Sequence, residues 1–596
     1  MAPRMPSEPR LEFRWSPATS PTSRGVRVAR LTCVRYTPTM NSPLARSDTP
    51  GRDPAWLGKL QALLLLTYLG YYAFLAFGLP IESVVNGTVD DSYYYLVVAR
   101  NIAAGLGSTF DGTGELTNGY HPLWMGFLVP LHLVVHDPEL GIRLTLALSG
   151  LLALAMLTLL MRTLNRTVGR WAGLTTLIVF AWPRFFGLTQ NALETALLLF
   201  VYAWVFHVFL QGRFTTTAGR VGLGLLLGFA MLARLDTVFL IFAVGIWSLL
   251  EWSRGGSLWD AFSEPSGRMG PLGSSAPVAK SLGAHSGSAL SRLLSHLPLL
   301  IVALPVLPYL FWNLSVFGHL QPVSGAMKTT FPSVGFHPEP FRDFPEYAAL
   351  LLVAFIAAFV GLRSRASRYA RALAVFSIAA LAHALYTVLF MIWAVDRWHF
   401  ALLVFIALIA LPGLGQWVLE RFRRPISAAI VGLAVAGGVV VQYYSLSLRN
   451  GRYQADTYEV ARWAREHLPE DAVLSATDSG VIAYFSGLST VNLDGLINSF
   501  DYLEHLREGE GAVEEYMRAK GVGYILHQNS FGLPDVISGN YEGRILRIAY
   551  RPEGRVSAEI LVSPELEVHR RVRDARRYLG SPKLEPNAII LYRFEH

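Results

Sequence analysis

Apolar runs long enough to cross a lipid bilayer recur along most of this chain. A transmembrane helix needs about 20 mainly apolar residues, because its backbone polar groups must all be bonded within the segment. Runs of roughly this length lie near residues 56–79, 142–161, 171–187, 193–212, 220–234, 236–252, 293–313, 346–362, 372–393, 398–418 and 426–446. Only 16% of the residues are charged, against roughly 25% in soluble domains. The pattern predicts a mainly α-helical, polytopic membrane protein.

One further apolar run, residues 122–135, decides the predicted topology. It has 14 residues and contains Pro130, so it is too short to span comfortably. If it does not cross, the Arg-rich loops near 162–170, 213–220, 254, 363–371 and 421–424 all share the side of the N-terminus. The positive-inside rule favours that arrangement. We therefore expect about eleven spans, an interfacial helix at 122–135, a cytoplasmic N-terminus and an extracytoplasmic C-terminus, in a cell membrane.

The basic residues serve topology in this interpretation. The net charge of +8 comes largely from Arg in the N-terminal tail and in short loops, so we do not expect a nucleic-acid partner. Residues 1–55 are rich in Arg, Pro, Ser and Thr, which predicts a disordered cytoplasmic tail. The single cysteine, Cys33, excludes an internal disulfide framework.

The remaining sequence divides into two expected domains. Residues 56–446 form the transmembrane domain, interrupted at 253–292 by a Gly/Ser/Pro-rich segment typical of a flexible linker, here a cytoplasmic one. From residue 447 the composition becomes that of a soluble domain. An amphipathic helix, a short strand and a Gly-terminated turn precede a buried strand at "GVGYILHQ". We expect 447–596 to be a small extracytoplasmic mixed α/β domain.

Polar residues gather in the loops that this topology places outside. The first outer loop, residues 80–141, opens with the acidic pair in "TVDDSYYY". Ionisable groups at membrane depth are costly and usually functional. The candidates from five separate outer segments are Asp90, Asp91, Tyr94 and His121; Glu194; Arg234; Lys328; and Arg397.

Each candidate also has a structural interpretation. Asp91 is placed to cap the helix that begins at "SYYYLVVARNIAAG". The negative charge of Asp90 would interact favourably with the positive end of that helix's dipole. Capping accounts for one carboxylate better than for two. Glu194 is placed to cap the next helix, His121 to form a turn, and Arg234 to pair with Asp236. The remaining structural interpretations are aromatic-belt anchoring for the tyrosines and no specific role for Lys328.

The first loop resembles that of a known group of enzymes. The sequence "VDDSYYYLVVARNIAAGLGSTFDGTGELTNGYHPLWMGFLVPL" is similar to the first extracytoplasmic loop of GT-C superfamily glycosyltransferases. These are the bacterial group related to lipid A aminoarabinose transferases, protein O-mannosyltransferases and mycobacterial arabinofuranosyltransferases. Supporting resemblances lie in "NALETAL", "LARLD", "NLSVFGHLQPVSGAMK" and "VNLDGLIN". Together they cover most of the chain from about residue 56 and imply a GT-C-type fold.

The resemblance implies a reaction and roles for residues. A sugar on a polyprenyl phosphate is transferred, with inversion, to an extracytoplasmic glycan, lipid or protein. Asp90 is then the catalytic base or a metal-linked carboxylate, with Asp91 beside it. Family members often carry a phosphate-contacting Lys before Pro, where this chain has His121. Lys328, Arg397 or Arg234 would supply the missing charge, and Glu194 and Tyr94 contact substrate.

Two matters stay open at this point. Some members of the group use a divalent metal, and Asp90 with Glu194 offers oxygen ligands suited to Mg²⁺ or Mn²⁺, although no cofactor is required by the sequence. Two other functions also fit many helices around polar loops. One is a transporter or flippase, although no internal repeat is visible. The other is a non-catalytic, glycan-binding relative of the enzymes. Neither the sugar nor the acceptor can be named.

Overall fold

The computed structural model describes eleven stretches of the chain. They are residues 55–212, 216–253, 297–363, 367–393, 395–421, 437–438, 453–508, 511–528, 544–550, 555–562 and 589–594. The predicted tail and linker, and the predicted span at 426–446, lie almost entirely outside them and stay predictions.

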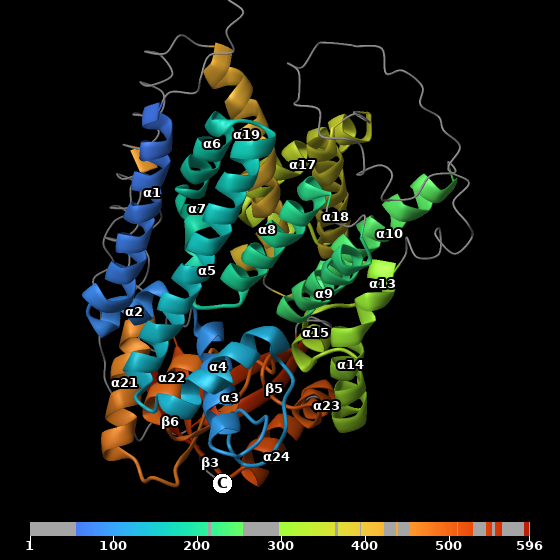
Figure 1. Cartoon of the computed structure of the whole chain (residues 1–596). Helices are drawn as coiled ribbons and strands as arrows, with labels where there is room; N and C mark the ends of the chain where they lie inside the picture. The colour runs from blue at the N-terminus through green and yellow to red at the C-terminus, as the bar shows by residue number, and fades with distance from the viewer. Residues whose placement is uncertain are drawn as a thin grey trace, which may run out of the picture. The chain divides into compact units, whose positions relative to one another are not determined.

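Long apolar helices, with short helical segments at their ends and breaks, make up the first part of the described chain (Figure 1). In chain order they are α1 (Ala55–Ala73) with η1 (Phe74–Gly78), α5 (Pro138–Thr167), α6 (Arg170–Phe180), α7 (Pro183–Phe186) with η2 (Gly187–Thr189), α8 (Thr195–Gln211), α9 (Thr217–Ala233), η4 (Leu235–Thr237), α10 (Val238–Ser253), α13 (Leu297–Ile301), α14 (Ala303–Phe317), α17 (Pro345–Arg363), α18 (Arg368–Phe390), η5 (Arg397–Phe400) and α19 (Ala401–Arg421). Each falls on a predicted apolar run, so the mainly α, polytopic class is confirmed.

Six helical segments in the described residues are long and apolar enough to span a membrane. They are Trp56–Gly78, Pro138–Thr167, Leu297–Phe317, Pro345–Arg363, Arg368–Phe390 and Arg397–Val418. A seventh counts if the pair Arg170–Phe180 and Pro183–Thr189, bent by 76°, is one span. The sequence predicted an unbroken run there, and Pro183 explains the break, because proline removes a helical hydrogen bond and clashes with the preceding turn. Eleven spans therefore stay a prediction.

Helix α17 shows how these helices differ from those of soluble proteins. One of its faces is apolar and exposed, at helical spacing, through Leu352, Phe355, Ile356 and Phe359. The other face is buried through Tyr347, Leu350, Ala354 and Ala358. At Gly361 an added Cβ would lie 2.2 Å from the carbonyl oxygen of Ala370, so α17 and α18 approach as small residues allow. An apolar outer face is suited to contact with lipid.

Short helices lie between the long ones. Residues 80–141, predicted to be the first outer loop, form α2 (Ile81–Gly87), α3 (Asp90–Ala103) and α4 (Pro122–Val134), and later loops form α15 (Val323–Lys328) and α16 (Glu339–Asp343). Helix α4 has 13 residues and contains Pro130, as expected for a helix that does not span. The predicted capping of α3 by Asp91 is wrong: the N-cap residue is Val89, and no side chain caps the helix.

The described part of residues 453–594 is mixed α/β. Its elements are α21 (Tyr453–His467), β1 (Val473–Ala476), α22 (Gly480–Ser486), β2 (Ser489–Asn492), α23 (Phe500–Glu508), α24 (Ala512–Ala519), β3 (Val522–Gln528), β4 (Arg544–Tyr550), β5 (Arg555–Val562) and β6 (Ile589–Arg593). We refer to this segment as the C-terminal domain.

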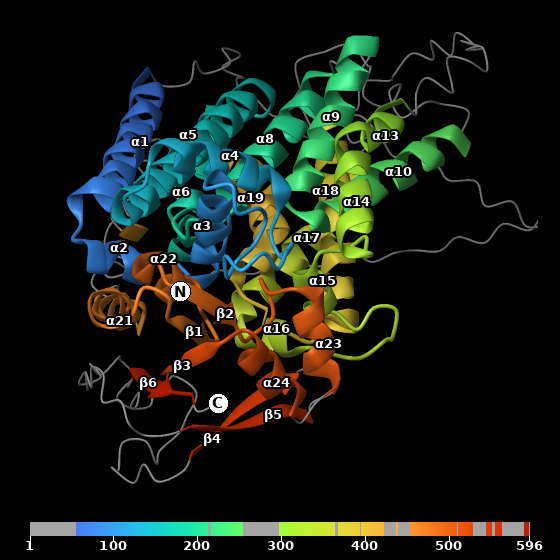
Figure 2. The same ribbon diagram turned by 90° about the horizontal axis from the view of Figure 1, so that it is seen from below.

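The main sheet of the C-terminal domain has the strand order β2-β1-β3-β6. Strand β1 is parallel to β2 and β3, with Leu474 opposite Thr490 and Tyr524, and β6 is antiparallel to β3. Three consecutive residues are buried in both β1 and β2, as in parallel strands covered on both faces. Helix α22 follows β1 and lies beside α3 in both views (Figures 1 and 2). The carboxyl ends of β1 and β2 therefore lead toward α3.

Candidate functional site

The two acidic residues at the start of α3 point into different surroundings. Asp90 is buried, and its carboxylate accepts hydrogen bonds from the N–H groups of Gly480, at 2.7 Å, and Val481, at 2.9 Å. Asp91 lines a pocket instead. Successive side chains on a helix are about 100° apart around its axis, so one carboxylate of the pair can bind the C-terminal domain while the other faces the pocket.

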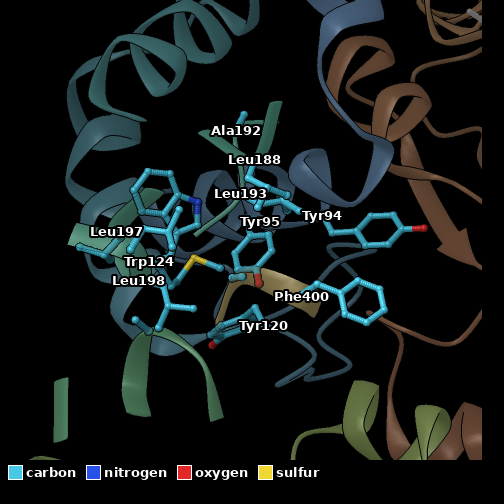
Figure 3. Packing of buried hydrophobic residues seen from close by; sticks show 14 of the residues in the cluster. Tyr94, Tyr95, Tyr120, Trp124, Leu188, Ala192, Leu193, Leu197, Leu198 and Phe400 are labelled. Carbon is cyan, nitrogen blue, oxygen red and sulfur yellow. The ribbon is translucent and has the colours of Figure 1, made fainter. Parts of the chain in front are cut away.

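The pocket joins residues from distant parts of the chain. It encloses about 50 Å³ and is lined by Asp91, Tyr94, Tyr95, Gly119, His121, Leu193, Glu194, Arg234, Ser324, Lys328, Trp398, His399 and Leu496. Six of the eight residues singled out from the sequence are among them. Figure 3 shows how α3 contributes: Tyr95 points toward the cluster around Trp124 and Tyr120, while Tyr94 points toward the C-terminal domain.

Glu194 and Arg234 form the most tightly bonded wall of the pocket. A guanidinium nitrogen of Arg234 lies 2.6 Å from Glu194 Oε1, and both side chains are almost fully buried. Arg234 also binds Asp236 at 2.9 Å, and Tyr95 donates to Glu194 Oε2 at 3.0 Å. The predicted Arg234–Asp236 ion pair is therefore present as part of a larger network. The predicted capping of α8 by Glu194 is wrong, because its side chain makes no cap bond.

Charge balance keeps this ion pair ionised. Burial raises the pKa of Glu194, but His121, Arg234 and hydrogen bonds to the carboxylate together lower it by more than burial raises it. The pKa of Glu194 therefore lies below its ordinary value. Burial likewise lowers the pKa of Arg234, whereas Asp236 and Glu194 raise it, and the net direction is upward. Arg234 therefore carries a charge that two carboxylates already neutralise.

His121 occupies the position where the enzymes that the first loop resembles often carry lysine. Its Nε2 lies 3.8 Å from Glu194 Oε1. Burial lowers the pKa of His121 to about 4, against the opposing effect of Glu194 and with a further lowering by Arg234. The imidazole is therefore neutral near pH 7. Its Nδ1 is buried and has no hydrogen-bond partner within the described part of the chain. His121 can offer a hydrogen bond to a ligand but not a positive charge.

Lys328 and Asp91 are the groups in the pocket that have charge to offer. Lys328 ends α15, and among the described residues its ammonium forms no ion pair. The pKa of Asp91 is raised to about 7, and burial is the largest cause. Lys328 opposes this rise, whereas Asp494 and Asp478 add to it. Asp91 thus changes protonation near neutral pH in the pocket that Lys328 also lines.

Arg397, predicted to bind phosphate, does not line the pocket. Its guanidinium carbon lies 5.7 Å from the ring centroid of Phe344. The next two residues, Trp398 and His399, line the pocket in its place. The turn "VDRWH" was singled out from the sequence, but the direction of each side chain depends on the 3₁₀ helix η5, which a pattern of residues does not fix.

The C-terminal domain closes one side of the pocket. Tyr94 donates a hydrogen bond to Asp494 Oδ2 at 2.5 Å, and Asp494 Oδ1 accepts one from the N–H of Leu496 at 2.8 Å. An added Cβ at Gly119 would lie 2.2 Å from the carbonyl oxygen of Leu496. Sequence reasoning missed Asp494 and Leu496 as site residues, although both belong to the motif "VNLDGLIN".

The predicted metal ligands do not fit a shared site. Both oxygens of Asp90 accept backbone N–H groups, and both oxygens of Glu194 are bonded, one of them to the cation Arg234. In the stretches that the structure describes, no group of three or more His, Cys, Asp or Glu residues could hold a metal ion. We therefore derive no step through Mg²⁺ or Mn²⁺.

A protein-family model described as a domain of unknown function, DUF8728, matches residues 443–578. A search of curated protein sequences found no match. Among solved structures, ArnT from Cupriavidus metallidurans bound to undecaprenyl phosphate is 14% identical, with a TM-score of 0.49, over 82% of this chain and 96% of that one. The Archaeoglobus fulgidus oligosaccharyltransferase in its apo form is 12% identical, with a TM-score of 0.48, over 86% of this chain and 76% of that one.

ArnT and the oligosaccharyltransferase are both GT-C membrane glycosyltransferases. Both TM-scores lie below 0.5, and the case for function rests on the residues of this chain.

Proposed function

We propose that this protein is a membrane glycosyltransferase that moves a sugar from a polyprenyl-phosphate donor to an extracytoplasmic acceptor, with inversion. The observation that carries the proposal is that Asp91 and Lys328 line the same pocket. Inverting transfer needs a base for the acceptor and a positive charge for the departing phosphate. The first-loop motif, which resembles that of GT-C enzymes, gives the class of donor.

Asp91 is the base in this proposal. Its carboxylate takes the proton of an acceptor hydroxyl as that oxygen attacks the anomeric carbon of the donor. The bond from the anomeric carbon to the phosphate oxygen breaks, and polyprenyl phosphate leaves with the bonding electrons. A base works best when its pKa is close to the working pH, and the pKa of Asp91 is raised to about 7.

Lys328 stabilises the charge that develops on the leaving phosphate. Arg234 is a poorer candidate, because Glu194 and Asp236 already neutralise it at 2.6 and 2.9 Å. His121 is neutral near pH 7 because its pKa is lowered to about 4, so its contribution is a hydrogen bond. The Glu194–Arg234 network forms another part of the pocket wall and orients the substrate.

The pocket must widen when substrate binds. Its volume of about 50 Å³ holds only a few water molecules, since each needs about 10–15 Å³ on the same measure. A sugar phosphate is larger than that. We expect the wall made by Trp398, His399 and Leu496 to move outward when substrate enters, since conformational steps commonly accompany substrate binding in enzymes.

The test is transfer in detergent, where no gradient can exist. Wild-type protein is given a panel of polyprenyl-phosphate sugars together with extracts containing candidate acceptors, and polyprenyl phosphate is measured. Release that depends on Lys328 supports the proposal. Uptake of lipid-linked sugar by proteoliposomes, with no release in detergent, would favour a transporter. Glycan binding without release by any donor and acceptor would favour a non-catalytic relative.

A further inference from the structure

Two charged residues of α3 bind the two ends of α22 in the C-terminal domain. At the start of α22, Asp90 accepts the N–H groups of Gly480 and Val481. At its end, Arg100 donates to the carbonyl oxygens of Tyr484, at 3.0 Å, and Ala483, at 3.3 Å. The first N–H and last C=O groups of a helix lack partners within it and carry the ends of its dipole. The acidic side chain of Asp90 at the start of α22 accepts the free N–H groups, and the basic side chain of Arg100 at its end donates to the free carbonyl oxygens.

Close backbone contact fixes the register of this docking. A Cβ added to Gly480 would lie 2.3 Å from the carbonyl oxygen of Asp90 and 2.9 Å from its Oδ2, so a larger residue cannot occupy that position without displacement. Tyr93, on the same helix as Asp90, packs against Tyr484 and Phe485, with ring centroids 5.7 and 5.5 Å away. Helix α22 can therefore sit on α3 in one position.

The same docking brings a wall to the pocket. Strand β1 leads into α22, and the neighbouring strand β2 leads into the segment that contains Asp494 and Leu496. That segment is held to α3 by the Tyr94–Asp494 hydrogen bond. A shift of α22 along α3 would therefore move Leu496 relative to Asp91.

We propose that Asp90 is a positioning residue that fixes the C-terminal domain on α3, so that the 494–496 segment forms the acceptor-side wall of the pocket beside Asp91. The inference rests on the proposed function. It differs from the role that the family resemblance implies, in which the first acid of the pair is the base. Asp90 is buried, and both its oxygens receive N–H groups rather than facing the pocket.

Three variants of the full-length protein test this inference. In Asp90→Asn the side-chain NH₂ replaces one of the two acceptor oxygens, so one backbone N–H of α22 faces a second donor and loses its hydrogen bond. Gly480→Ala disturbs the same contact while every carboxylate remains, which keeps the test valid if Asp90→Asn fails to fold. The matched control is Asp471→Asn, which changes an exposed carboxylate of the C-terminal domain.

Hydrogen exchange of the α22 amides measures the docking without any reaction. We expect faster exchange at residues 480 and 481 in Asp90→Asn and Gly480→Ala, and wild-type exchange in the control. Exchange in Asp90→Asn equal to that of wild type would overturn the inference. If wild-type protein transfers no sugar, the proposed function fails, and this exchange still decides whether Asp90 holds the domain.

Kinetics separate positioning from catalysis. A misplaced wall is expected to raise the acceptor KM on the order of 10- to 100-fold, while the acidic limb of the pH–rate profile is kept. A further variant that combines Asp90→Asn with Gly480→Ala should then lose little more than either single variant, because both changes act on one contact. Loss of transfer and of the acidic limb in Asp90→Asn, with α22 protected as in wild type, would make Asp90 the base and overturn the inference.

Discussion

Glu194 and Arg234 form a buried ion pair, 2.6 Å between Oε1 and a guanidinium nitrogen, that ties the start of α8 to the end of α9. Removing one partner of such a pair leaves an uncompensated buried charge and costs roughly 3–5 kcal/mol. We expect Arg234→Met to lower the thermal unfolding temperature in detergent and Glu194→Gln/Arg234→Met to recover part of the loss.

The exposed pair Arg342–Asp343 provides the control for the ion pair. Arg342→Met should leave the unfolding temperature unchanged, because exposed ion pairs contribute little. Equal unfolding temperatures for Arg234→Met and wild type would show that Glu194 and Arg234 are not coupled in the folded protein.

Lys328 is expected to act on the leaving phosphate. Lys328→Gln should lower kcat/KM for the donor by roughly 10²–10³-fold, the usual loss when one charge-stabilising group is removed. Lys328→Arg keeps the charge and should keep part of the activity. Lys59→Gln, at an exposed lysine of α1, is the control and should behave as wild type. Full activity in Lys328→Gln would remove the lysine from the mechanism.

The rate of transfer should fall as the pH drops through about 7. Burial raises the pKa of Asp91 from 3.8 to about 7, so the folded protein binds this proton more tightly than the unfolded chain does. The ionised base is therefore lost below pH 7. The stability contributed by the tighter proton binding is fully present below the unfolded pKa and is lost as the pH rises through about 7.

Two measurements check the titration of Asp91. In wild-type protein, log kcat/KM plotted against pH should bend near pH 7. In Asp91→Asn the residual rate should lack that bend, and the unfolding temperature should change less between pH 4 and 7 than in wild type. A bend that persists in Asp91→Asn would assign the titration to another group.

The contact between Gly119 and Leu496 should be sensitive to a single methyl group. A Cβ at Gly119 would lie 2.2 Å from the Leu496 carbonyl oxygen, so Gly119→Ala must displace the wall of the pocket. We expect lower transfer activity with the protein still folded. Gly126→Ala is the matched control, because no atom lies within 4 Å of its added Cβ and alanine favours a helix interior. Activity that falls equally in both variants would argue against a specific contact.

The helices could be predicted from the sequence because each apolar run fixes its own element. The run at 372–393, for instance, became α18 at Arg368–Phe390. Predicted spans at 193–212 and 220–234 also became helices, but of 17 residues each. The break at Pro183 was missed because the apolar pattern continues across it, although a proline inside a run is a visible signal.

The site could be predicted only in part, because side-chain direction depends on distant contacts. Polar residues in predicted outer loops identified Asp91, Glu194 and Lys328, which meet in the pocket. The different surroundings of Asp90 and Asp91 could not be predicted, since they are set by Gly480, 390 residues further along the chain. Likewise Leu496 reaches the pocket only through the docking of the C-terminal domain.

The central claim is that Asp91 performs the proton transfer. The most direct measurement compares release of polyprenyl phosphate by wild type and Asp91→Asn, in detergent, with a donor and acceptor that wild type uses. We predict a fall in kcat of roughly 10²–10⁴-fold, the usual contribution of general-base catalysis, with thermal unfolding at neutral pH showing a folded protein. Near-normal kcat in folded Asp91→Asn would contradict the account.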